Sequence, residues 1–133
     1  MNKKEQGKKN RASGQRFELK VRKDLESKGW IVDKWTNNIK DNKLVPAMSN
    51  RFNMRSMGFP DFVAFKNLHL GYKVIAVECK TGKYLDKEEK AKVKWYLDNN
   101  IFSKIFVAYE DKKEIKFREK CDILLCPTTL ICP

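Results

Sequence analysis

The sequence predicts an α/β domain with a central mixed β-sheet of about five strands flanked by two main helices. Short runs rich in β-branched and aromatic residues alternate with two stretches in which apolar residues recur at helical spacing. Runs 61–65 and 72–80 are close enough for an antiparallel hairpin, whereas a helical stretch separates 72–80 from 104–110. A strand-helix-strand unit predicts parallel pairing, and the sheet is therefore expected to be mixed.

The first helix is predicted from Ser13 to Lys28, because its apolar residues recur every fourth position and Gly29 can end it. These apolar residues are Phe17, Val21 and Leu25. Glu18 lies at the margin of their stripe and can face a cleft, although a plain exposed glutamate fits the pattern as well. Residues 1–12 are basic and predict a flexible arm, so that residues 13–133 form a single domain.

The next segments are a strand and a loop. Residues 30–36 predict a strand at or near a sheet edge, because Asp33 and Lys34 interrupt its apolar pattern. Residues 37–57 are polar and predict a long loop, and loops above about 15 residues in compact domains are usually functional or disordered. This loop leads directly into Gly58-Phe59-Pro60-Asp61.

The hairpin register sets two carboxylates face to face. A turn centred between His69 and Leu70 places Asp61 opposite Glu78. Because strand side chains alternate, Lys80 shares the face of Glu78. The sequence thus predicts an acidic pair with an adjacent ammonium group.

Such a pair suits a hard divalent cation. Two close carboxylates repel each other unless a cation lies between them, and oxygen ligands favour Mg²⁺ or Mn²⁺. Lys80 then stabilises negative charge near the ion or, with a lowered pKa, takes a proton from an attacking water. Cys79 points to the opposite face, yet its backbone carbonyl can still reach a metal. The alternative is a solvated cross-strand charge pair between Glu78 and Lys80.

The rest of the chain predicts a helix and two strands. Asp86 and Glu89 have the spacing of a capping box, and the helix that follows ends at Asp98-Asn99-Asn100. Its sheet-facing residues are expected to be Val93, Tyr96, Leu97 and Ile101. Residues 104–110 predict a buried strand, and residues 114–118 predict a half-exposed one.

Asp61 followed by Glu78-Cys79-Lys80 at a hairpin end resembles the signature of the PD-(D/E)XK nuclease superfamily. Gly14-Gln15-Arg16-Phe17-Glu18, with Lys28-Gly29-Trp30 further on, is similar to the first helix of archaeal-type Holliday-junction resolvases. The resemblance covers about residues 11 to 110. The chain also resembles VRR-type nucleases. It departs from their pattern at Glu89-Lys90, where a glutamine is usual.

The resemblance implies a restriction-endonuclease-like core and Mg²⁺-dependent hydrolysis of DNA. It implies that Glu18 joins Asp61, Glu78 and the Cys79 carbonyl at the metal, with Lys80 beside them. It further implies a homodimer that cuts opposed strands of a four-way junction during recombination or repair. A VRR-like repair nuclease that cuts flaps or duplex, and a non-catalytic basic nucleic-acid-binding protein, remain the alternatives.

Charge points to a polyanionic partner. The 29 Lys and Arg against 17 Asp and Glu give a net charge of +12. The expected DNA contacts are Arg11, Arg16, Arg51, Arg55 and Lys83. No apolar run of membrane-spanning length and no signal peptide is visible, so we expect no membrane partner and a cytoplasmic site of action, in a cell or in a virus-infected host. The spacing of the four cysteines does not favour zinc.

Overall fold

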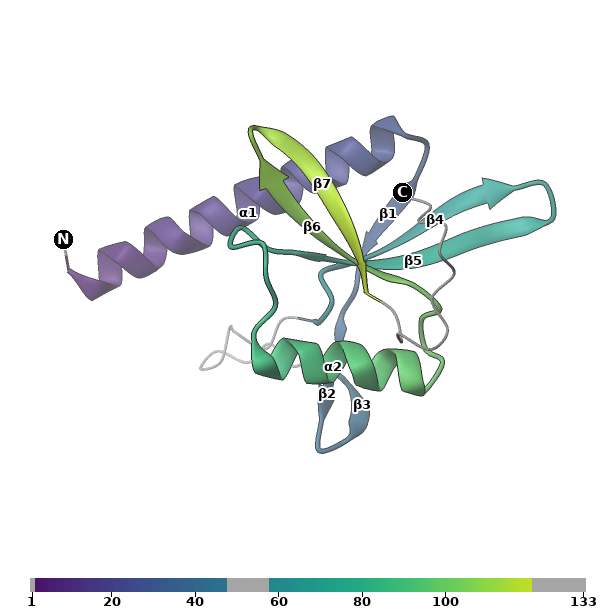
Figure 1. Ribbon diagram of the computed structural model, residues 1–133. Helices are drawn as coiled ribbons and strands as arrows, with labels where there is room; N and C mark the ends of the chain where they lie inside the picture. The colour runs from purple at the N-terminus through teal and green to yellow at the C-terminus, as the bar shows by residue number, and fades with distance from the viewer. Residues whose placement is uncertain (1, 48–57, 121–133) are drawn as a thin grey trace.

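The computed structural model describes residues 2–47 and 58–120 (Figure 1). In chain order its elements are α1 (Lys3–Ser27), β1 (Ile31–Lys34), β2 (Asn37–Lys40), β3 (Lys43–Pro46), β4 (Phe62–Leu68), β5 (Gly71–Cys79), α2 (Lys87–Asp98), β6 (Ile105–Asp111) and β7 (Glu114–Lys120). Cys121, Cys126 and Cys132 lie outside the described residues.

The main sheet has five strands in the order β1-β4-β5-β6-β7. Neighbouring strands are antiparallel except for β5 and β6, which pair in parallel across the α2 connection. The predicted mixed α/β sheet with two helices is therefore confirmed. Strand β1, which the sequence predicts to lie at or near a sheet edge, is an edge strand of this sheet.

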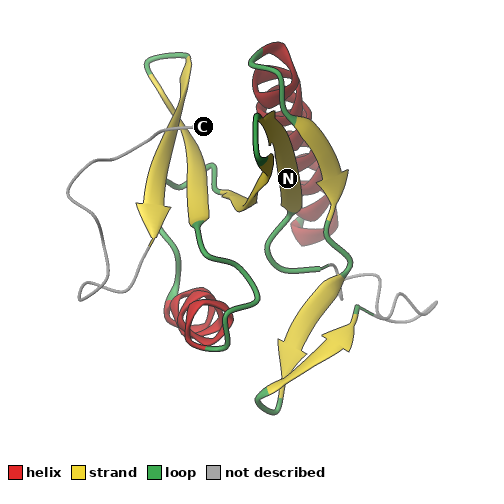
Figure 2. Cartoon of the chain, turned by 90° about the vertical axis from the view of Figure 1, so that its right-hand side faces the viewer, coloured by secondary structure: helices red, strands yellow, loops and turns green. Residues whose placement is uncertain are grey.

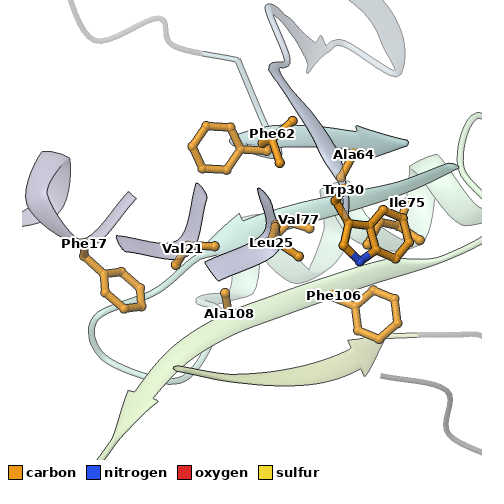
Figure 3. Packing of buried hydrophobic residues seen from close by; sticks show 11 residues of the cluster. Phe17, Val21, Leu25, Trp30, Phe62, Ala64, Ile75, Val77, Phe106 and Ala108 are labelled. Carbon is orange, nitrogen blue, oxygen red and sulfur yellow. The ribbon is translucent and has the colours of Figure 1, made fainter. Parts of the chain in front are cut away.

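The two helices pack on opposite faces of the sheet, and strand alternation divides the core between them. Ile75 and Val77 of β5 join a cluster under α1, whereas Ala76 joins a cluster under α2. Figure 3 shows the first cluster, in which Phe17, Val21 and Leu25 of α1 lie on the sheet. The second cluster includes Val93 and Tyr96 of α2.

Helix α1 begins at Lys3 and not at Ser13, so residues 3–12 of the expected flexible arm are helical. Asn2 caps the helix: its side chain accepts the Glu5 N–H, and the Glu5 side chain accepts the Asn2 N–H. This reciprocal cap stabilises the start of the helix, where no apolar stripe packs on the sheet. The first turns of α1 extend beyond the sheet (Figure 1). The predicted end is confirmed, because Gly29 follows the helix with φ +93°.

The β4–β5 hairpin has the predicted register. Phe62 pairs with Val77 and Leu68 with Gly71, so one further step places Asp61 opposite Glu78. His69 is exposed in the turn. The hairpin therefore delivers the two carboxylates to the same end of the sheet, where β4 begins and β5 ends.

The expectation of a long loop over residues 37–57 is wrong for residues 37–46. Strands β2 and β3 form a hairpin that projects from the main sheet (Figure 2). Its turn residues Asp41 and Asn42 have φ 52° and 58°, and Asx residues tolerate this left-handed region better than most. Arg51 and Arg55 fall outside the described residues.

Helix α2 has the predicted Asp86–Glu89 capping box. Ile101 lies beyond the helix and is 38% exposed, so its expected place against the sheet is wrong. Neither helix of the described segments is long and apolar enough to cross a membrane.

Candidate functional site

The candidate site lies where β4 begins and β5 ends. Asp61 precedes β4, and its Oδ2 accepts the backbone N–H of Cys79 at 2.8 Å. Glu78, the penultimate residue of β5, is only 7% exposed, and its carboxyl group hydrogen-bonds with that of Asp61. The two predicted carboxylates are therefore in direct contact in a largely buried environment.

A tight segment holds Asp61 in place. A Cβ added to Gly58 would lie 2.1 Å from the Trp35 carbonyl oxygen, so only glycine fits there. The Tyr96 hydroxyl donates to the Phe59 carbonyl and accepts the Trp35 indole N–H. The Trp35 backbone N–H in turn donates to the Asp61 carbonyl at 3.1 Å. The position of Asp61 thus depends on both β1 and α2.

Glu18 reaches the same site from α1. It follows the buried Phe17 and is itself half-buried. Burial, followed by the charge of Asp61, raises its pKa from the ordinary 4.5 to about 7, and its side chain hydrogen-bonds with Asp61. Asp61 is therefore the shared partner of two other carboxyl groups.

The three carboxyl groups do not ionise independently. Burial is the largest cause that raises the pKa of Glu78, followed by the charge of Asp61. Burial also raises the pKa of Asp61, although hydrogen bonds from Cys79, Glu78 and Glu18 oppose this effect. Glu18 and Glu78 thus tend to stay protonated and donate hydrogen bonds to Asp61, and full ionisation of the three groups needs a compensating cation.

The oxygen atoms of the cluster are of the chemical type that a divalent cation prefers. Glu78 Oε2 is buried and has no hydrogen-bond partner among the described residues, so one acceptor of the cluster is unsatisfied. Hard carboxylate oxygens are the ligands that Mg²⁺ prefers. Within residues 2–47 and 58–120, however, no group of three or more His, Cys, Asp or Glu side chains is arranged to hold a metal ion. The metal ligands Asp61, Glu78, Glu18 and the Cys79 carbonyl therefore stay a prediction.

Lys80 lies beside the carboxylates and is held by α2. Its Nζ is 2.9 Å from Glu89 Oε1 and 3.1 Å from Oε2, with side chains 26% and 16% exposed. Burial lowers the pKa of Lys80, but the hydrogen bond and charge of Glu89, together with Glu78, outweigh it and the net pKa is raised. Lys80 is therefore an ammonium group at neutral pH.

Cys79 lies on the other face of the strand. Its side chain packs against the α1 cluster, as expected from the alternation. Burial, with the nearby charges of Asp61, Glu78 and Glu18, raises the pKa of its thiol. The thiol thus stays protonated, and only the backbone of Cys79 serves the site.

Sequence reasoning missed two neighbours of the cluster. Glu89 was assigned only to the capping box, yet it also binds Lys80. Lys34, at the end of β1, lowers the pKa of both Glu18 and Asp61 through its charge. The pairing of β1 with β4, which sets Lys34 opposite Phe62, brings Lys34 here, and strand patterns alone do not specify that pairing.

The expected DNA contacts are dispersed. Arg11 and Arg16 are exposed on α1, and Arg11 Nε donates to the Gly7 carbonyl at 3.4 Å. Lys83 Nζ lies 3.6 Å from Asp111 Oδ1, so the charge of Lys83 is partly neutralised.

No protein-family model, curated protein or solved structure matches this chain.

Proposed function

We propose that this protein is a metal-dependent endonuclease that hydrolyses DNA phosphodiester bonds. The observation that carries the proposal is the contact between the carboxyl groups of half-buried Asp61 and buried Glu78, with Glu18 hydrogen-bonded to the same Asp61. Buried like-charged groups destabilise a fold unless a proton or a cation compensates them, and perturbed carboxyl groups cluster at catalytic centres. The net charge of +12 favours a polyanionic substrate.

In this proposal Asp61, Glu78 and Glu18 hold Mg²⁺, for which Mn²⁺ can substitute. The bound ion supplies a Lewis acid and a water of lowered pKa. Asp61 is oriented for this role by the Cys79 N–H. Lys80, whose pKa is raised, stays protonated and places a positive charge near the reacting phosphate. Glu89 fixes the position of that charge, which makes Glu89 a positioning residue.

We propose a restriction-endonuclease-like core and, as substrate, a four-way DNA junction cut by a homodimer. The order β1-β4-β5-β6-β7, with helices on both faces and the carboxylates at a strand end, supports the core assignment. The junction preference and the dimer rest on the resemblance of the first helix to resolvases. A VRR-like nuclease has the same chemistry but acts on flaps or duplex.

A cleavage assay separates these functions. Labelled four-way junction, flap and linear duplex are incubated with the protein in Mg²⁺ or in EDTA. We expect Mg²⁺-dependent cuts at symmetrical positions in opposed strands of the junction. Faster cutting of flap or duplex than of the junction supports the VRR-like alternative. Binding without cleavage of any substrate contradicts the nuclease proposal and identifies a non-catalytic nucleic-acid-binding protein.

A further inference from the structure

A cavity of about 470 Å³ lies between α1 and the turn that joins β6 to β7. It is lined by Ser13, Arg16, Phe17, Lys20, Thr81, Glu110, Lys112 and Lys113, and we name it the basic groove. Two of the lining residues are sequence neighbours of the carboxylate site, because Phe17 precedes Glu18 and Thr81 follows Lys80. The backbone at both points therefore runs directly from the carboxylate site to the groove.

The groove concentrates positive charge. Four of its lining side chains are cationic, and Glu110 is the single carboxylate among them. Glu110 is engaged by Lys20, with Nζ and Oε2 3.3 Å apart. In the described part of the chain no carboxylate forms an ion pair with Arg16, Lys112 or Lys113. A concave surface with three uncompensated cations attracts an anion more strongly than a flat one.

The turn that supplies two of these cations is conformationally costly. Asp111 pairs with Glu114, so Lys112 and Lys113 form a two-residue hairpin turn. Their φ angles are 49° and 65°. Such turns favour Asn-Gly, because residues with a Cβ are strained in the left-handed region. Lys112 and Lys113 thus occupy a turn in which Asn-Gly would have less backbone strain. Backbone strain of this kind is typical of functional positions.

We propose that the basic groove binds a phosphate of the nucleic-acid backbone adjacent to the phosphate that is cut. The inference rests on the proposed nuclease function, because it takes the carboxylate site as the place of the scissile phosphate. Arg16 offers a bidentate guanidinium, and Lys112 and Lys113 offer point charges, which is the donor set that phosphate requires. The same chemistry accepts a free phosphate, and the test below separates the two sources.

The test exploits the turn geometry. The double variant Lys112→Asn, Lys113→Gly removes both charges and installs the residues that the turn favours, so its thermal stability is expected to equal or exceed that of the wild type. Binding of a labelled junction and a duplex is measured in EDTA over a range of salt concentrations, so the result does not depend on cutting. We expect about tenfold weaker binding and a salt slope that is smaller by about 1 to 2.

A matched control removes two other lysines. Lys66→Gln, Lys73→Gln changes the charge equally at a cross-strand pair of the β4–β5 hairpin, away from the groove. This control is expected to lower affinity much less than the groove variant. Equal losses in the two variants indicate a general charge effect and overturn the proposal, as does unchanged binding by a folded groove variant.

A second experiment measures the binding of inorganic phosphate to the wild type and to the groove variant. Tight binding of phosphate to the wild type that the groove variant loses, without loss of DNA binding, assigns the groove to a free phosphate and contradicts the backbone assignment. Failure of the nuclease function is a separate result: the wild type then cuts nothing in Mg²⁺, whatever the groove variant binds. A cutting wild type with an unaffected groove variant refutes the groove alone.

Discussion

The ammonium group of Lys80 contacts both carboxylate oxygens of Glu89, at 2.9 Å and 3.1 Å. This contact joins the end of β5 to the first turn of α2. It also fixes the protonation of Lys80, since burial alone lowers the lysine pKa and Glu89 is the largest opposing influence. The protonation of Lys80 is thus controlled by a residue of α2, whose charge also raises the pKa of Glu78.

Replacement of Glu89 is expected to change the pH profile of cleavage. In Glu89→Gln the amide oxygen still accepts the Asp86 N–H, so the cap survives. Lys80 then loses its anionic partner and its pKa falls. We expect a cleavage rate about 10- to 100-fold lower, and an alkaline decline that begins at lower pH than in the wild type.

Glu88→Gln is the control for this change, because Glu88 is in the same helical turn but its side chain is 80% exposed and contacts Lys92. Its profile is expected to match that of the wild type. An unchanged alkaline limb in Glu89→Gln, with only a lower rate, would show that Glu89 does not govern the charge of Lys80.

The metal-free protein is expected to lose stability as pH rises. The pKa of Glu18 is about 7 when folded and 4.5 ordinarily, so the folded state holds a proton that the unfolded state releases between these values. The stabilisation from this proton is complete below about pH 4.5 and disappears as pH rises through about 7. Thermal unfolding in EDTA at pH 5 and pH 8 measures this change, and Glu18→Gln is expected to flatten it. An equal pH dependence in Glu18→Gln would exclude Glu18 as its source.

Glu78→Gln is expected to stabilise the metal-free protein at pH 8. Burial and the charge of Asp61 raise the pKa of Glu78, so folding at pH 8 requires either a bound proton or a buried charge at this position, and the amide removes that cost at nearly constant volume. The wild type is expected to gain about 2.7 kcal/mol from Mg²⁺ at 100 times its dissociation constant, and the variant much less. Unfolding with and without Mg²⁺ measures both effects. An equal Mg²⁺ gain in the variant would remove Glu78 from the ligands.

Tyr96→Phe is expected to destabilise the fold by about 1 to 3 kcal/mol. The change leaves the Phe59 carbonyl and the Trp35 indole N–H without their partner in a buried position. Because this segment leads to Asp61, we also expect slower cleavage at temperatures at which the variant is fully folded. Tyr72→Phe is a control, since Tyr72 is 60% exposed. Urea unfolding gives the free energies, and equal stability of the two variants would contradict the role of Tyr96.

The parts of the fold that sequence predicted well are specified locally. Alternation and a short turn determine the register of β4 and β5, and that register alone brings Asp61 to Glu78. The stripe on α1 likewise determines which side of the helix faces the sheet and therefore where Glu18 lies. Capping residues located the start of α2.

The parts that sequence missed depend on reciprocal or long-range contacts. The cap at Asn2 extends α1 through residues without an apolar stripe, so periodicity gave no sign of it. The β2–β3 turn uses Asp41-Asn42 in place of Asn-Gly, which weakens the usual hairpin signal. The contact between Lys80 and Glu89 requires the packing of α2 on the sheet, and no spacing rule includes it.

The central claim is that Asp61 and its carboxyl neighbours hold a metal ion with which the protein hydrolyses DNA phosphodiester bonds. The most direct measurement is single-turnover cleavage of a labelled four-way junction in Mg²⁺ by the wild type, Asp61→Asn and the exposed control Asp33→Asn. In Asp61→Asn the side-chain amide oxygen still accepts the Cys79 N–H, so folding and DNA binding are expected to persist. The account predicts Mg²⁺-dependent cutting by the wild type and Asp33→Asn, with a loss of at least about 100-fold in Asp61→Asn. Undiminished cutting by Asp61→Asn, or no cutting by the wild type, would contradict it.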